Sequence, residues 1–222
     1  MRWLMIFAVI SASLLLGISC HDNGPDPPPD DPIKISDPAS FFQVAEGNIW
    51  SYNNGVEVRE LDGDTVINGV TCARLLKAGA TSEAWTVDAA GFYQHLLDGQ
   101  IWFDPPLAIP FSLEKDKPYA ISSIARQLGD TTALASLTGT LTFTGYVSRM
   151  VMEYDYDSLV HLEYQTTIYN FADDVSKQDD FEEYWARNIG LVFSPDSDPT
   201  DGINDELSLD SALIDGVWLP VR

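Results

Sequence analysis

The sequence predicts an all-β protein, an antiparallel meander that forms a curved sheet, a half-barrel or a barrel-like domain with at most short helices. From Val160 to Ile168, apolar and polar side chains alternate with a period of two, the pattern of a strand with one wet face. Connections between apolar runs are mostly two to six residues long, which suits antiparallel neighbours and leaves no room for helical crossovers.

The predicted elements begin with a short helix that Ser36-Asp37-Pro38 would cap and that would run through Phe42, with proline at its first position. A later strand alternates Leu141 and Phe143 with threonines, and Gly145 after it invites a bulge or a bend. The other predicted strands are 48–60, 65–68, 70–77, 83–88, 91–97, 100–103, 117–127, 181–187, 189–194 and 206–214.

The first twenty residues carry a secretory signal. A short basic start is followed by an apolar run from Trp3 to Leu16 and by small residues before Cys20. The run is too short for a helix that crosses a hydrocarbon core of roughly 30 Å. This segment resembles the lipobox of bacterial lipoproteins, which implies that Cys20 carries acyl chains such as palmitate and is the first mature residue. The alternative is a simple secretory signal with an incidental cysteine.

The predicted domains are a signal peptide (1–19), a lipidated cysteine with a tether (20–34) and a single β-rich domain (35–222). The tether combines prolines with aspartates and has almost nothing apolar to bury, so we expect an extended chain. A lipidated Cys20 cannot pair with Cys72, and no internal disulfide is expected. The residue after Cys20 is His21. In enteric bacteria an aspartate at this position resembles a signal that retains the lipoprotein in the inner membrane, so its absence favours the outer membrane.

Charge narrows the range of partners. The chain has 12 Lys+Arg against 34 Asp+Glu, a formal net charge of -22, so a nucleic-acid backbone would be repelled. The same negative charge disfavours docking to anionic lipid through basic residues, and any membrane attachment would come from the lipid anchor.

Four short motifs resemble a group of uncharacterised bacterial envelope lipoproteins. They are Gly-Asn-Ile-Trp-Ser-Tyr at 47–52, Asp-Thr-Val-Ile-Asn-Gly at 64–69, Gly-Phe-Tyr at 91–93, and Tyr184-Trp185 leading to Gly-Leu-Val at 190–192. The resemblance spans most of residues 41–194. It implies an envelope location and a β-rich fold and carries no catalytic residue. A curved sheet like that of lipoprotein carrier proteins is an architecture suggested by analogy.

No catalytic motif of the common hydrolase, nucleotide-binding or metalloprotease types is present, and no enzyme activity is predicted. Cys72 has no base supplied nearby in the sequence and is interpreted as a small buried side chain. Glu182 and Glu183 are adjacent in a predicted strand and point to opposite faces, so they cannot form a glycosidase pair by themselves. Asp155 and Asp157 are interpreted as solvated charge.

Two other segments are candidate binding sites. The acidic loop at 196–206 is the densest group of oxygen ligands, and Asp196, Asp198 and Asp201 are candidate calcium ligands, although an ordinary acidic turn is the simpler alternative. The segment 101–111 is apolar and broken by prolines, which predicts an irregular cover rather than a central strand. Its Trp102, Phe103 and Phe111 are candidate contacts for a ligand or a protein partner.

These features predict a lipid-anchored binding protein of the bacterial envelope, for an apolar ligand or an envelope component, with no cofactor beyond the candidate calcium. A structural or assembly lipoprotein that contacts a protein through a sheet edge or the 101–111 segment is the first alternative. An envelope hydrolase is the second. A closed apolar cavity favours ligand binding, an exposed apolar patch favours assembly, and converging carboxylates in a polar cleft favour hydrolysis.

Overall fold

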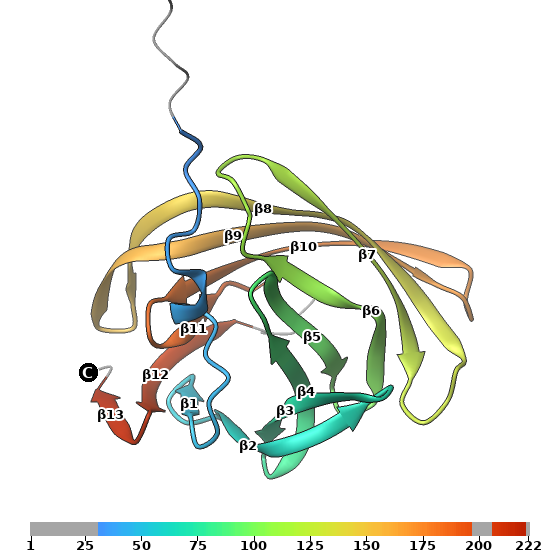
Figure 1. The fold of residues 1–222 in the computed structure, drawn as a ribbon, viewed down its shortest axis with the longest axis horizontal. Coiled ribbons are helices and arrows are strands. Elements are labelled where there is room, and N and C mark those ends of the chain that lie inside the picture. Colours follow the sequence, from blue (N-terminus) through green and yellow to red (C-terminus); the bar gives the residue numbers. More distant parts are fainter. Residues whose placement is uncertain (1–30, 197–205, 221–222) are drawn as a thin grey trace, which may run out of the picture. The chain divides into compact units, whose positions relative to one another are not determined.

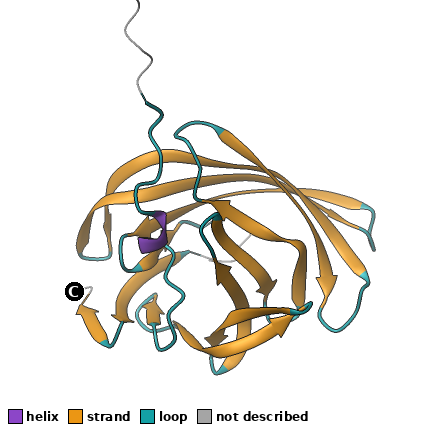
Figure 2. Ribbon diagram, in the orientation of Figure 1, coloured by secondary structure: helices purple, strands orange, loops and turns teal. Residues whose placement is uncertain are grey.

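The computed structural model describes residues 31–196 and 206–220, and within them the regular elements are strands and one short 3-10 helix (Figure 2). Consecutive strands pair antiparallel in the order of the sequence, which confirms the predicted all-β meander. The strands are β1 (Ile49–Tyr52), β2 (Glu57–Ile67), β3 (Val70–Lys77), β4 (Ala80–Val87), β5 (Gly91–Leu97), β6 (Ile101–Pro110), β7 (Pro118–Gln127), β8 (Ala133–Val151), β9 (Tyr154–Asn170), β10 (Val175–Ala186), β11 (Gly190–Ser194), β12 (Leu207–Ile214) and β13 (Val217–Pro220).

A pairing between the two ends of the meander closes the sheet. β1 pairs with β2 on one side and with β12 on the other, where Ile49 lies opposite Leu213 and Trp50 opposite Ala212. Strands β1 to β12 therefore form a barrel, and β13 pairs with β12 outside this ring (Figure 1). Of the three predicted forms of the sheet, the barrel is the one observed, and closure leaves the ring without an edge that needs a cover.

Several predicted details agree with the structure and others differ from it. The alternating segment 160–168 lies in β9, and the register of β8 against β9 shifts between Phe143 and Gly145, where a bulge was expected. The predicted strand 48–60 is divided because Asn53, Asn54 and Gly55 adopt positive φ angles in a turn between β1 and β2. The predicted helix is a single 3-10 turn, η1 (Pro38–Ser40), with proline at its start.

The prediction of an irregular cover over 101–111 was wrong, because residues 101–110 form strand β6. Prolines are tolerated here because the ladder is interrupted around them. β6 pairs with β5 through its residues 101–102 and 107–110, and it pairs with β7 through its residues 101–104. Pro105 and Pro106 therefore have no ladder partner on either side. The expected strand-breaking residues therefore mark an irregularity inside a barrel strand.

The chain ahead of β1 enters the barrel. We call residues 33–46 the plug segment. Phe42 is 1% exposed and its ring packs against Phe92 of β5 and Trp185 of β10, at centroid distances of 5.3 and 4.7 Å. Arg187 holds the segment from outside by pairing with Asp37 at 2.9 Å. In Figure 1 the plug segment lies across the barrel between β11 and β5.

Among residues 31–196 and 206–220, no helix has the length and hydropathy needed to cross a membrane.

Candidate functional site

The barrel interior contains a cavity of about 360 Å³. This volume is at the lower end of the range of about 300–1,000 Å³ that is usual for small-molecule sites. Aliphatic and aromatic side chains form most of its wall, and the aromatic ones are Trp50, Tyr52, Trp85, Phe92, Phe103, Tyr164, Phe181 and Trp185. Polar groups are fewer, namely Gln43 of the plug segment, Arg59, Glu83, Gln94, Thr166, Asp179, Glu183 and Ser194.

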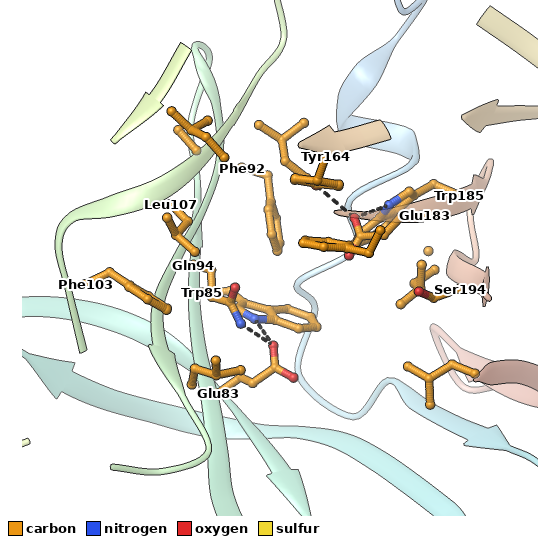
Figure 3. Close-up of a pocket in the computed structure, with 18 of the residues that line it drawn as sticks. Glu83, Trp85, Phe92, Gln94, Phe103, Leu107, Tyr164, Glu183, Trp185 and Ser194 are labelled. Carbon is orange, nitrogen blue, oxygen red and sulfur yellow. Dashed lines mark hydrogen bonds between the residues drawn. The ribbon is translucent and has the colours of Figure 1, made fainter. Parts of the chain in front are cut away.

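A sequence pattern that occurs twice places two carboxylates in this cavity. The sequence reads Glu-x-Trp at Glu83–Trp85 in β4 and at Glu183–Trp185 in β10. Because side chains two apart in a strand share a face, each glutamate and its tryptophan both point inward. The two strands are half a ring apart in a barrel of twelve, so the carboxylates come from opposite walls. Figure 3 shows each glutamate beside its own tryptophan.

Glu83 belongs to a charged network. Its Oε2 accepts hydrogen bonds from Trp85 Nε1 at 2.8 Å and Gln94 Nε2 at 2.9 Å, and its Oε1 lies 3.4 Å from Arg59 Nη1. Arg59 Nε also lies 2.6 Å from an oxygen of Glu57, whose second oxygen pairs with Lys77 at 2.6 Å. Burial raises the pKa of Glu83 above its ordinary value, although the Arg59 charge opposes that rise.

Glu183 is placed similarly but has different partners. Its Oε2 accepts hydrogen bonds from Tyr164 OH at 2.9 Å and from Trp185 Nε1 at 3.0 Å. Within the described chain, no Lys, Arg or His nitrogen lies within ion-pair distance of it. Burial raises the pKa of Glu183, and the Glu83 charge raises it further. The two hydrogen bonds and, less strongly, the more distant Arg59 charge oppose this rise, and the direct partners of Glu183 are neutral donors.

A second group of polar residues lies on the opposite face of β9 and β10. Ligand atoms of His161, Glu163 and Glu182 all lie within 4.8 Å of one another, and Glu163 is directly opposite Glu182 in the ladder. His161 Nε2 is 3.2 Å from Glu182 Oε2, and its Nδ1 is 2.6 Å from Thr144 Oγ1. One imidazole and two carboxylates are a ligand set that a divalent metal ion accepts.

The residues proposed from the 101–111 segment have three different positions. Phe103 lines the cavity. Trp102 lies in a separate buried cluster, where its Nε1 donates to the carbonyl oxygens of Gln127 and Asp130. Phe111 stacks on Phe42 of the plug segment at 5.7 Å.

The other predicted residues lie mostly outside the cavity or outside the described chain. Asp196 is described, whereas Asp198, Asp201 and Cys20 lie outside the described residues. Cys72 is free and buried, and burial raises its pKa, which fits the expected structural role.

Sequence reasoning missed the main polar groups of the cavity, namely Arg59, Glu83 and Gln94, and it placed Glu183 on a strand face without assigning it a role. The repeated Glu-x-Trp pattern was a signal that could have identified two of the four groups with their tryptophans. Arg59 and Gln94 have no comparable mark, because the pairing of β2 with β3, β3 with β4 and β4 with β5 is what brings them beside Glu83.

Comparisons with known proteins give little further information. No protein-family model and no curated protein matches this chain. Among solved structures, a chain described as a "putative lipoprotein" from Parabacteroides distasonis is similar, with a TM-score of 0.45 and 11% sequence identity, over 76% of this chain and 96% of that one. Similarity of this degree carries no argument about function.

Proposed function

We propose that this protein is a lipid-anchored binding protein of the bacterial envelope and that its barrel holds a small ligand with an apolar or aromatic body. The observation that carries this proposal is the cavity of about 360 Å³ with its largely aromatic wall. Protein interiors are packed closely and contain few voids larger than a water molecule, so a space of this size inside a barrel core calls for an occupant. The lipobox at Cys20 supports attachment to a membrane through acyl chains.

The composition of the wall supports binding rather than simple core packing. Ligand sites combine apolar surface with a few polar groups that fix the orientation of the bound molecule. Here the aromatic rings supply the surface, and Glu83, Glu183 and Gln94 supply the polar groups. These polar side chains are already held by hydrogen bonds to their neighbours, so the site is organised before any ligand arrives.

A second candidate function is assembly with a protein partner through β13. Among the described residues this strand pairs with β12 only, outside the closed ring, so its other side is an edge of the described sheet. Its Val217 and Trp218 are each 59% exposed. An edge strand with an exposed tryptophan is a surface that an extended segment of a partner can pair with.

Native mass spectrometry of the full lipoprotein released from nanodiscs tests ligand binding. We expect a noncovalent small-molecule mass in addition to the covalent acyl chains. Leu107→Trp, which enlarges a side chain that faces the cavity opposite Gln94, should remove that mass, whereas Ala120→Trp at an exposed position of β7 should keep it. Bare acylated polypeptide in every sample would contradict the proposal and leave assembly through β13 as the better explanation.

A further inference from the structure

The charges around the cavity do not balance, and the imbalance concerns Glu183. Lys77 and Arg59 supply two positive charges to a network that contains the carboxylates of Glu57 and Glu83, so that network is neutral when all four groups are ionised. Glu183 lies outside it and makes no ion pair with any described residue. Asp179, two positions before Phe181 on the same face of β10, adds a further carboxylate to the cavity wall.

A carboxylate in this position needs a counterion or a proton. Removing an ion from water is unfavourable in proteins unless a partner of opposite charge compensates. The two hydrogen bonds to Glu183 come from neutral groups, the phenol of Tyr164 and the indole of Trp185, and both reach the same oxygen, Oε2. The other carboxylate oxygen is therefore available to a bound molecule.

The aromatic wall suits a positive charge as well. Ring contacts connect Trp50, Trp85, Phe92 and Trp185 in a continuous series, at centroid distances of 6.5, 5.3 and 5.9 Å. Their indole N–H groups donate to protein acceptors, so a ligand meets π-systems rather than unpaired donors. Aromatic faces attract cations, and Arg59 already lies over the ring of Tyr52 at 5.3 Å.

An anionic ligand fits the site poorly. Among the residues that line the cavity, Arg59 is the single Lys or Arg, and its guanidinium is already engaged by Glu57 and Glu83. A fatty-acid carboxylate would therefore meet two acidic walls and no free counterion. The formal net charge of -22 also repels anions and concentrates cations near the protein.

We propose that the cavity binds a small organic cation, an ammonium group on an apolar or aromatic body, with its charge paired to Glu183 and its body against the tryptophan wall. This inference rests on the proposed binding function and specifies the ligand class. It excludes fatty acids and other anionic lipids as the natural occupants of the cavity.

Two probes of the same shape and different charge test the inference. These are (3-hydroxyphenyl)trimethylammonium and its neutral isostere 3-tert-butylphenol, titrated calorimetrically into the full lipoprotein in nanodiscs, with empty nanodiscs as the blank. We expect the cation to bind at least tenfold more tightly than the isostere. Glu183→Gln should remove this preference by weakening cation binding at least tenfold while leaving isostere binding unchanged, because glutamine keeps the shape and an acceptor oxygen.

Asp180→Asn is the matched control, since it removes an exposed charge on the opposite face of the same strand. It should leave both affinities as in the wild type. Equal affinities for the two probes, a preference that survives Glu183→Gln, or no binding of the cation would each overturn the cation inference. None of these outcomes decides the proposed function, which the small-molecule mass and its loss in Leu107→Trp test separately.

Discussion

Replacement of Phe42 by alanine tests whether the plug segment is part of the barrel core. The Phe42 ring is 1% exposed and lies 4.7 Å from the ring of Trp185, 5.3 Å from Phe92 and 5.7 Å from Phe111. Truncation of a fully buried phenylalanine costs about 3–5 kcal/mol of stability through lost burial and the cavity it leaves. Here the three ring contacts come from β5, from β10 and from the residue after β6, so neighbouring side chains cannot move together to refill the space.

Urea denaturation followed by tryptophan fluorescence measures the loss in free energy of unfolding, and thermal melting measures the accompanying shift in melting temperature. For a domain of this size each kcal/mol lowers the melting temperature by about 2–4 °C, so Phe42→Ala should lower it by roughly 6–20 °C. The control is Phe171→Ala, since Phe171 is 44% exposed beside the end of β9 and its loss should cost about 0.5 kcal/mol or less. A loss below about 1 kcal/mol for Phe42→Ala would refute the view that the plug segment completes the core.

Four further predictions concern the packing of β8 on β9, the lipid anchor, calcium binding and the pH dependence of stability. Gly139→Ala should lower the melting temperature because its Cβ would lie 2.1 Å from the carbonyl oxygen of Gln165 in β9. Cys20→Ser should move the protein to the soluble fraction on cell fractionation while the circular dichroism of the β domain stays the same. If Asp196, Asp198 and Asp201 bind calcium, millimolar calcium should raise the melting temperature and Asp198→Ala should remove that gain, because the ion would bind only the folded state. Burial raises the pKa of Glu183, so the unfolded chain releases this proton at lower pH, and the unliganded protein should lose stability as pH rises from about 4.5 through the raised pKa. Urea midpoints at pH 4, 6 and 8 should show a smaller loss for Glu183→Gln.

Each of these four predictions would be contradicted by a specific outcome. An unchanged melting temperature for Gly139→Ala would mean that β8 and β9 are not so closely paired at this point. A Cys20→Ser protein that stays with the membrane, or a native protein without acyl mass, would argue against the lipid anchor. Calcium without effect on melting would leave the ordinary acidic turn as the explanation. A Glu183→Gln variant with the pH dependence of the wild type would show that this carboxyl titrates normally in the folded protein.

Local patterns predicted the strands well because the alternation of side chains is itself the physical basis of a half-buried strand. β3 and β5 begin and end at the predicted residues, and the bulge at Gly145 follows from the freedom of glycine. Only the start of β6 was predicted, as 100–103, because proline was expected to end the strand, whereas the strand continues and only its ladder is interrupted at Pro105 and Pro106. β13, with only four residues, was not predicted at all.

Closure of the barrel lay beyond local patterns. It depends on β1 pairing with β12, and the two strands are separated by most of the domain. An alternating sequence fixes which face of a strand is apolar but not whether the last strand returns to the first. The expectation that the irregular segment 101–111 would cover the apolar face followed from an open sheet, and closure together with the plug segment removes the need for it.

The two Glu-x-Trp patterns show how tertiary neighbours decide what a local motif does. In each, the strand turns the glutamate inward and the indole two residues later donates to its Oε2. At Glu83, β2 brings Arg59 alongside and the charge is neutralised within the protein. At Glu183, the neighbouring strand β9 brings the phenol of Tyr164, which solvates the carboxylate without neutralising it. The same three-residue pattern therefore makes a structural ion pair on one wall of the cavity. On the opposite wall it leaves a carboxylate without an ion-pair partner, which a cationic ligand can supply. This difference is the reason that Glu183, rather than Glu83, is the residue to test.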